Sequence, residues 1–167
     1  HHAVFGLGDA CAARRGEAFI PSPGTQAPTH IATSVWCAHC FNEPETPAAA
    51  RWLAEAELDR TATALWTHTE FSSAAGIKLR SKGQTRTAVA RAQQAFESAV
   101  AMAHPLDVMT EDFLYAAELC RTRAVKLRAG DALHLAIALR HNCRTLASLN
   151  RDMTDAAKQL GMHVAVF

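Results

Sequence analysis

The chain has 167 residues, a mass of 18.0 kDa and a formal net charge of +1 at pH 7, with 49% apolar and 20% charged residues. This length suits one domain with a sizeable core and is too short for two ordinary domains. The composition is that of a globular protein, and no uninterrupted apolar run approaches the length of a membrane span, so we expect no membrane segment.

The cysteine count and the N-terminal segment bear on compartment and domain boundary. Five cysteines, an odd number, and no signal peptide at the front predict free thiols in a reducing compartment, which we take to be the cytoplasm. The chain opens on two histidines, interpreted as the remains of a purification tag. Residues 1–29 are rich in glycine and proline and have few large apolar side chains. We therefore expect a flexible tail there and a folded domain over residues 30–167.

Short β-branched segments alternate with amphipathic segments through the first half of this domain. Thr46-Pro47 is typical of a helix start, and Lys82-Gly83 is typical of a helix end. In chain order the predicted elements are a strand over 29–35, helices over 35–41 and 48–58, a strand over 61–66, and helices over 67–80 and 85–102. Glu70 therefore lies just after a strand, in the first turn of a helix.

The second half continues the alternation. Thr110 is expected to cap a helix with Glu111 and Asp112 in its first turn. The apolar face of this helix is predicted to comprise Phe113, Leu114, Ala117 and Cys120. The remaining predicted elements are a strand over 106–109 before this helix and, later in the chain, a strand over 144–149, a helix over 153–160 closed by Gly161, and a strand over 162–167. Asn150 follows the end of its strand directly.

The stretch from Leu127 to Leu139 is the most distinctive in the chain. Gly130 is interpreted as the end of the preceding segment and Asp131 as the cap of the next helix. Apolar residues cover almost the whole surface of that helix, which predicts a core helix buried on several sides. A carboxylate in its first turn is stabilised by the helix dipole and still within reach of a ligand. Asp131 is thus either a simple N-cap or a site carboxylate held by a rigid helix.

Strands that alternate with helices predict a mostly parallel sheet covered on both faces, a three-layer α/β/α sandwich. In this class ligands bind at the carboxyl ends of the strands. Glu70, Asn150 and the turn Ala32-Thr33-Ser34 follow such ends. We therefore expect these residues at one edge of the sheet.

Two segments without acidic residues carry several bases each. The first segment, residues 71–96, contains Lys78, Arg80, Lys82, Arg86 and Arg91. The second, residues 119–130, contains Arg121, Arg123, Lys126 and Arg128. They are interpreted either as basic surfaces or as ordinary solvated helix faces, and the fold decides between the two.

The segment Trp36-Cys37-Ala38-His39-Cys40 resembles the redox motif of thioredoxin-like proteins, in which a thiol at a helix N-terminus has a lowered pKa. The strand before it is short and polar, and no hairpin follows that would complete that sheet. Buried cysteines that act as small hydrophobic residues are therefore the preferred interpretation of Cys37 and Cys40. A zinc site at this pair would need two further ligands at suitable spacing, which the sequence lacks.

Four segments stand out when the chain is taken as a whole. They are Ile31-Ala32-Thr33-Ser34, Thr67-His68-Thr69-Glu70-Phe71-Ser72-Ser73-Ala74, Arg128-Ala129-Gly130-Asp131-Ala132-Leu133-His134-Leu135-Ala136 and Leu146-Ala147-Ser148-Leu149-Asn150-Arg151-Asp152-Met153. In order and spacing they resemble the PIN-domain ribonucleases of the VapC toxin type, over roughly residues 30–167. The resemblance implies a PIN-like fold, a metal-dependent endoribonuclease toxin of a toxin–antitoxin pair, an RNA substrate, a cognate antitoxin as partner, and a homodimer.

Cleavage of a phosphodiester requires an activated water and neutralisation of the charge that grows on the phosphate, and Mg²⁺ or Mn²⁺ held by carboxylates does both. The resemblance implies that Glu70 and Asp131 are catalytic, metal-binding acids. It assigns Asn150 as a neutral ligand or water-positioning group. Asp152 is an alternative ligand, although the helix direction is expected to turn it to solvent. His134, one turn after Asp131, is expected to be a packed helix residue rather than a ligand.

The first acid of the family's set, an Asp at the end of the first strand, is replaced here by Ala32. The resemblance therefore implies a protein whose metal binding and RNA cleavage are impaired or absent, through deliberate inactivation or as a naturally silenced copy. Two other functions stay open. One is a thioredoxin-like thiol oxidoreductase that uses Cys37 and Cys40, and the other is a catalytically dead PIN scaffold that binds RNA or an antitoxin.

Overall fold

Five parallel strands form the sheet at the centre of the molecule, in the order β3-β2-β1-β4-β5. They are β1 (Thr29–Ile31), β2 (Thr61–Ala64), β3 (His104–Leu106), β4 (Thr145–Ala147) and β5 (His163–Val164). The computed structural model describes residues 27–81, 83–122 and 126–167, so most of the predicted tail over 1–29 lies outside the described residues. Thr29 is in register with both Thr61 and Thr145, which aligns the ends of the three central strands.

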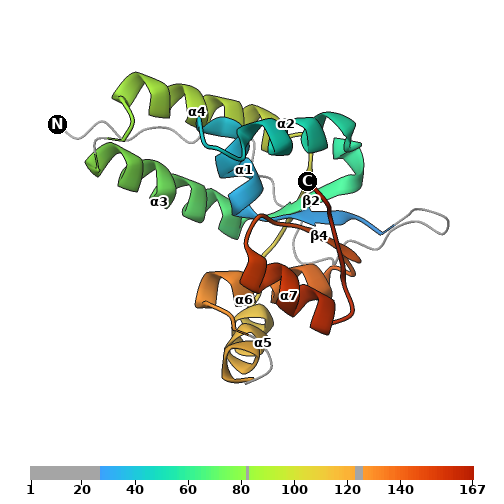
Figure 1. Ribbon diagram of the computed structural model, residues 1–167. Helices are drawn as coiled ribbons and strands as arrows, with labels where there is room; N and C mark the ends of the chain where they lie inside the picture. The colour runs from blue at the N-terminus through green and yellow to red at the C-terminus, as the bar shows by residue number, and fades with distance from the viewer. Residues whose placement is uncertain (1–26, 82, 123–125) are drawn as a thin grey trace.

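Helices cover both faces of the sheet (Figure 1). One face carries α1 (Thr33–Cys40), α2 (Thr46–Glu55), α3 (Trp66–Arg80) and α4 (Arg86–Val100). The other face carries α5 (Thr110–Arg121), α6 (Ala129–Arg140) and α7 (Arg151–Gln159). A short 3₁₀ helix, Leu58–Arg60, leads into β2. The predicted three-layer α/β/α sandwich is confirmed.

Each helical layer packs its own hydrophobic core on the sheet. On the α1–α4 side, the Phe71 and Phe96 rings stack with their centroids 4.1 Å apart, and Trp36 meets Phe96 edge to face. The indole Nε1 of Trp36 donates to Thr63 Oγ1 at 3.1 Å, so this fully buried ring keeps its polar atom bonded. Burial of such aromatic rings supplies a large part of the stabilisation of this layer.

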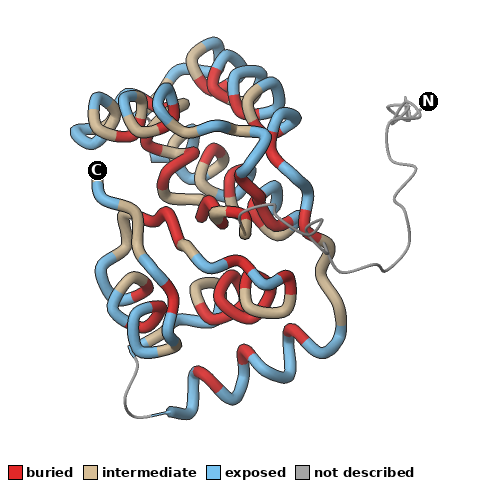
Figure 2. Tube along the Cα trace, turned by 90° about the vertical axis from the view of Figure 1, so that its right-hand side faces the viewer, coloured by how far each residue is buried: buried red, intermediate tan, exposed pale blue. Residues whose placement is uncertain are grey.

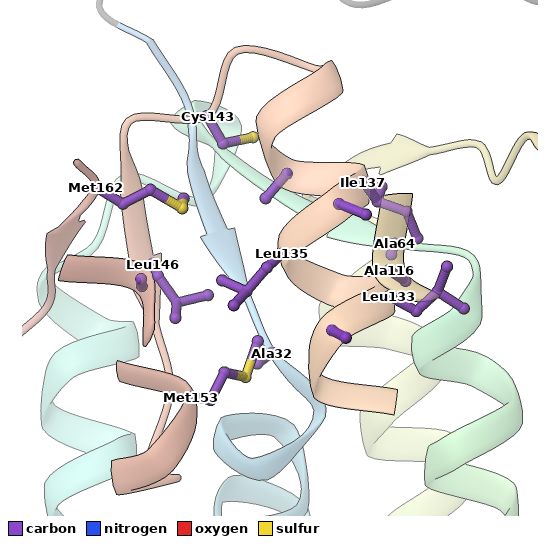
Figure 3. Close-up of a cluster of buried hydrophobic side chains, with 14 of the residues drawn as sticks. Ala32, Ala64, Ala116, Leu133, Leu135, Ile137, Cys143, Leu146, Met153 and Met162 are labelled. Carbon is purple, nitrogen blue, oxygen red and sulfur yellow. The ribbon is translucent and has the colours of Figure 1, made fainter. Parts of the chain in front are cut away.

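The second core surrounds α6. Residues Ala132 to Ala138 are all buried, and Figure 3 shows Leu133, Leu135 and Ile137 of this helix among side chains from the sheet and from the neighbouring helices. The predicted core helix is confirmed. Its start was predicted wrongly, because Arg128 is the N-cap. Gly130 and Asp131 therefore lie inside the first turn, where Asp131 is not the cap.

The prediction for the apolar face of α5 is wrong. This helix buries Asp112, Ala116 and Leu119, whereas the face predicted to pack against the core is exposed. An ion pair fixes this orientation: Arg140 Nε and Nη2 of α6 lie 2.7 and 2.9 Å from the two carboxylate oxygens of Asp112. Because a buried carboxylate needs its partner, this pair outweighs the apolar pattern.

Several element ends also differ from the prediction. The strand predicted over 106–109 spans His104–Leu106 and includes Pro105, which an edge strand tolerates because its outer N–H groups need no partner. The last helix begins at Arg151, since the Asn150 side chain caps it. Only His163–Val164 of the predicted final strand pair with the sheet. No helix within the described ranges is both long enough and apolar enough to cross a bilayer.

Candidate active site

The candidate site lies at the edge of the sheet where β1, β2 and β4 end. Helices α1, α3 and α7 begin within a few residues of these ends, at Thr33, Trp66 and Arg151. Helix α6 begins at the same edge, since its first turn contacts the residue that follows β4. Helix amino ends carry partial positive charge, so this edge favours carboxylates and anionic ligands.

Glu70 of α3 receives hydrogen bonds from two other elements. Thr33 Oγ1, at the start of α1, donates to Glu70 Oε2, and His134 Nε2 of α6 lies 2.6 Å from the same oxygen. Burial by itself raises the pKa of Glu70, but the hydrogen bond and charge of His134, together with Thr33, outweigh it and lower the pKa. Glu70 is thus an ionised carboxylate, 26% exposed, that its neighbours hold in place.

His134 connects Glu70 to a second buried histidine. His30 Nε2, in β1, lies 3.0 Å from His134 Nδ1, and the two residues are 0% and 2% exposed. Because the carboxylate only accepts, His134 Nε2 carries the hydrogen of its bond to Glu70, and the bond between the two imidazoles joins His134 Nδ1 to His30 Nε2. Burial, and then the charges of His134 and His141, hold the pKa of His30 well below 6.5.

The sequence predicted only part of this arrangement. His134 is a packed helix residue, as expected, but it also bonds to a site carboxylate. Its spacing of one turn from Asp131 was the signal that it faces the same edge. His30 was missed, because a single histidine in a short strand carries no pattern. Thr33 belonged to a motif, yet nothing in the sequence indicated its bond to Glu70.

Asp131 and Asn150 meet beside this group. Asn150 Nδ2 donates to Asp131 Oδ2 at 3.1 Å, while its carbonyl Oδ1 caps α7 by accepting from the Met153 amide at 3.3 Å. The cap fixes the Asn150 side chain, which in turn orients Asp131. Burial raises the pKa of Asp131, with His134 acting against it and the nearby charge of Glu70 acting with it.

Gly130 is required by the close approach of α6 to α3. A Cβ at this position would lie 2.5 Å from Glu70 Oε1 and 3.7 Å from Trp66 Nε1. Any other residue here would push the carboxylate away. The backbone of the first turn of α6 therefore forms one wall around Glu70.

Ala32 follows β1 directly, at the N-cap of α1, and its side chain faces the core. Its side chain is 2% exposed, and Figure 3 shows it beside Met153 of α7. Its amide donates to Ala147 O at 2.9 Å, which ties the position to β4. No oxygen ligand comes from this residue, although its neighbour Thr33 reaches Glu70.

The donor set fits a divalent metal only in part. Mg²⁺ and Mn²⁺ favour several oxygen ligands. Glu70 and Asp131 each have one oxygen bonded to protein, and the Asn150 carbonyl is used in a helix cap. Within residues 27–81, 83–122 and 126–167, no three His, Cys, Asp or Glu side chains are arranged to hold a metal. The residues present therefore do not make a complete metal centre.

The other candidate groups lie around or away from this cluster. Asp152 has a side chain 51% exposed and lies 3.7 Å from Lys126 Nζ, so it faces solvent rather than Asp131. Among the predicted bases, Lys126 and Arg128 precede α6 and are exposed, and the charge of Arg128 acts on Asp131. Lys82 and Arg123 lie outside the described residues.

Cys37 and Cys40 are half-buried free thiols in α1. Both pack against the core on the α1–α4 side, and burial raises the pKa of each thiol to about 12. A redox-active cysteine needs a lowered pKa and an exposed sulfur. The interpretation as small hydrophobic residues is therefore favoured over the oxidoreductase.

Comparison with known proteins gives one family. The model of the PIN domain family matches residues 31–159. No curated protein sequence matches significantly. Among solved structures, FitAcB from Neisseria gonorrhoeae superposes with a TM-score of 0.60 at 16% identity, over 81% of this chain and 95% of the other.

Two further structures are similar. VapC20 of Mycobacterium tuberculosis, a toxin that cleaves the sarcin-ricin loop, gives a TM-score of 0.60 at 17% identity, over 77% of this chain and 94% of the other. A toxin–antitoxin complex from Klebsiella pneumoniae gives 0.57 at 19% identity, over 83% and 96%. At these identities the likeness concerns the fold.

Proposed function

Because the chain belongs to the PIN domain family, we propose that it is the toxin of a toxin–antitoxin pair, built as a metal-dependent endoribonuclease and impaired in cleavage by Ala32. The observation that carries this proposal is the convergence of Glu70, Asp131 and Asn150 at the carboxyl ends of the central strands. These residues come from α3, α6 and the turn after β4, far apart in the sequence.

We propose Mg²⁺ or Mn²⁺ as the cofactor, with Glu70 and Asp131 as carboxylate ligands and Asn150 as the amide that positions Asp131. A bound divalent cation would lower the pKa of water and neutralise charge on the phosphate. The chain's own contribution is the fixed orientation of the two carboxylates. Affinity is expected to be weak, because Ala32 supplies no third carboxylate.

An RNA substrate is supported by the charges around the acids. Lys126 and Arg128 are exposed just before α6, and Arg151 is exposed at the start of α7. Bases that flank an acidic cluster attract the phosphates of a strand that the acids alone would repel. We therefore propose that the RNA backbone passes over the amino ends of α6 and α7.

Partners and domain limits complete the proposal. A cognate antitoxin and a homodimer are inferred, and the solved complexes similar in fold, such as the Klebsiella pneumoniae one, support the antitoxin. An RNA target implies the cytoplasm. The folded domain is proposed to cover residues 30–167, which agrees with the family match over 31–159.

A second candidate is a scaffold that binds RNA or the antitoxin without cleavage. Ala32 favours it, because this residue is buried in the core and leaves the donor set incomplete. Here the acids would serve only the fold and the surface charge. The nuclease and the scaffold share the fold. They differ in the expected effect of a carboxylate at position 32, which would restore RNA cleavage only in the nuclease.

Ala32→Asp is the experiment that tests the proposal. The variant is expected to bind Mn²⁺ more tightly in calorimetry and to cleave RNA in a manner blocked by EDTA. The gain should be large, since each ~1.4 kcal/mol of transition-state stabilisation is tenfold in rate. Addition of Glu70→Gln or Asp131→Asn should abolish both effects. A folded Ala32→Asp protein with unchanged Mn²⁺ affinity and no cleavage of a broad RNA panel would reject the nuclease and leave the scaffold.

A further inference from the structure

One basic segment of the chain has no role in the function proposed above. Residues 71–96 contain no acid, and Arg80 and Arg86 in this segment are exposed, with no ion-pair partner in the described part of the chain. Lys78 differs, because its Nζ lies 2.5 Å from Glu43 Oε1. Figure 1 shows α3 and α4 side by side, projecting past the end of the sheet. Figure 2 shows exposed residues along the outer turns of the layer to which they belong.

Helix α3 connects the acid cluster to these arginines. Glu70 lies in its second turn, and Arg80 is its last residue. At about 3.6 residues per turn, one side of the helix carries Glu70, Ser73, Ile77 and Arg80, which we call the α3 track. The last three of these side chains are exposed. A rise of about 1.5 Å per residue places Arg80 roughly 15 Å from Glu70 along the helix axis.

The side chain of Arg80 is folded back along the α3 track. A Cβ at Gly76, one turn earlier in the helix, would lie 3.0 Å from Arg80 Nη1. The guanidinium group therefore occupies the space that a side chain at Gly76 would fill, and its charge points back towards the acids. A guanidinium group can donate to two oxygens of one phosphate at the same time.

A hollow lies at the end of the α3 track, between the last turn of α3 and the first turn of α4. Its volume is about 750 Å³, and its lining includes Leu79, Arg80, Thr85 and Arg86. Thr85 Oγ1 accepts from the Ala88 amide at 3.1 Å, so a side-chain cap fixes the start of α4. Leu79 is 38% exposed and provides an apolar wall beside the two cations. This combination fits a nucleotide, with its base or ribose on the leucine and its phosphate on the arginines.

We propose that the α3 track and this hollow bind a single-stranded segment of the RNA, next to the phosphodiester that lies at the acids, with Arg80 and Arg86 on its phosphates. This inference rests on the proposed function, in which the RNA crosses the amino ends of α6 and α7. The strand then continues from the acids along α3. Ile77, which is 55% exposed in the middle of the track, contacts a base or ribose there.

A single strand fits this surface better than a duplex does. Paired bases are stacked inside a duplex, whereas unpaired bases offer their faces to side chains such as Ile77 and Leu79. An acidic protein segment would also be attracted by the arginines. The α3 track begins at the acids that are proposed to act on a phosphodiester, however, so one RNA strand reaches both places.

The first test measures the binding of a labelled single-stranded RNA of about 12 nucleotides by fluorescence anisotropy, in EDTA so that no cleavage occurs. Arg80→Glu and Arg86→Glu should each weaken binding by about tenfold, with unchanged circular dichroism. Arg91→Glu is the matched control, because it makes the same change in charge at an exposed residue of α4 outside the hollow. Losses as large for Arg91→Glu as for Arg80→Glu would overturn the proposal.

The second test uses salt dependence to count the phosphates. For single strands, the slope of log affinity against log salt concentration is about −0.7 per neutralised phosphate. The double variant Arg80→Ala with Arg86→Ala should therefore make this slope shallower by roughly 1.4. Ile77→Ser should weaken binding without a change in slope, because it removes an apolar contact. A slope that the double variant leaves unchanged would overturn the placement of the phosphates.

Competition distinguishes the classes of occupant. Unlabelled single-stranded RNA should displace the labelled strand at a lower concentration than a duplex of the same length or polyglutamate does. Arg80→Glu should reduce this preference for the single strand over polyglutamate. Equal displacement by RNA and polyglutamate would show that an acidic protein segment fits as well, and the proposal would fail.

Failure of this inference is distinguishable from failure of the proposed function. If Lys126→Glu and Arg128→Glu weaken RNA binding and Arg80→Glu does not, the α3 track is rejected and the RNA substrate stays. If Arg80→Glu weakens RNA binding while a folded Ala32→Asp protein neither binds Mn²⁺ more tightly nor cleaves, the track stands and the nuclease is rejected. An intact chain that binds no RNA would reject both.

Discussion

His134 Nε2 lies 2.6 Å from Glu70 Oε2, although 64 residues separate the two positions in the chain. The bond connects α6 to α3 across the edge of the sheet. The other ring nitrogen of His134, Nδ1, lies 3.0 Å from His30 Nε2, so the same side chain also connects α6 to β1. Removal of His134 leaves a half-buried carboxylate and a buried imidazole without a shared partner.

His134→Leu is therefore expected to lower the free energy of unfolding by several kcal/mol, since each unsatisfied buried group costs about 1–3 kcal/mol. His134→Gln keeps an N–H near the position of Nε2 and should lose less. Urea unfolding measures both. Equal losses for Leu and Gln would mean that packing, rather than the hydrogen bond to Glu70, sets the effect.

Stability should fall as pH drops below 6.5 because of His30. Its pKa is lowered in the folded state, so the unfolded chain binds the proton first, and stability is lost as pH falls from 6.5 towards the folded-state pKa. One such proton contributes up to about 1.4 kcal/mol per pH unit. His30→Gln should reduce this slope between about pH 6 and 5 in urea unfolding. A slope equal to that of the unsubstituted chain would place the proton uptake elsewhere.

Gly130→Ala should cost stability in spite of the better helix propensity of alanine. The new methyl would lie 2.5 Å from Glu70 Oε1, so the carboxylate must move. Gly76→Ala in α3 is the control, because its methyl meets only the flexible end of Arg80, at 3.0 Å. That control should keep most of the roughly 0.5–1 kcal/mol gained from propensity. Thermal unfolding of the two variants measures the difference in stability between them. A Gly130→Ala variant more stable than the unsubstituted chain would contradict the close approach of Gly130 to Glu70.

Arg140→Met should destabilise the protein strongly. It leaves Asp112, whose side chain is 1% exposed, without its cation, and breaking such buried pairs costs about 3–5 kcal/mol. Arg151→Ala is the control, since Arg151 is 93% exposed and lies 3.8 Å from Asp155. It should change stability by less than about 0.5 kcal/mol. Similar effects of the two substitutions would show that the buried pair is not an anchor of α5.

The thiols of Cys37 and Cys40 should react slowly. Burial raises each pKa to about 12, so few thiolates form near neutral pH, whereas Cys120 is exposed. Among the four cysteines that the structure describes, Cys37, Cys40, Cys120 and Cys143, Ellman's reagent should label Cys120 first in the folded protein. The chain should not reduce insulin. Reduction that Cys37→Ser abolishes would restore the oxidoreductase as the primary function.

The sequence was sufficient for the layers and for placing Glu70 and Asn150 at one edge of the sheet, whereas Asp131 was expected beside them only through the family resemblance. An apolar surface all around α6 is compatible only with burial, and strand ends of a parallel sheet meet at one edge. The rotation of α5 about its axis could not be predicted from the sequence, because Asp112 and Arg140 lie 28 residues apart and their ion pair outweighs the apolar pattern of the helix. The start of α6 was misplaced, since Gly130 serves the approach to Glu70 rather than a helix end.

The pairing of β1 with β4 has a consequence for biosynthesis. Ile31 is in register with Ala147, so the central strand β1 lacks one of its two neighbours until β4 has left the ribosome. Such long-range pairing slows folding, because a large loop must close before the contacts form. The hydrogen bonds of His30 and Thr33 to His134 likewise cannot form before α6 has been synthesised. The acid cluster is thus absent from every nascent chain that ends before α6, and a truncated translation product cannot carry it.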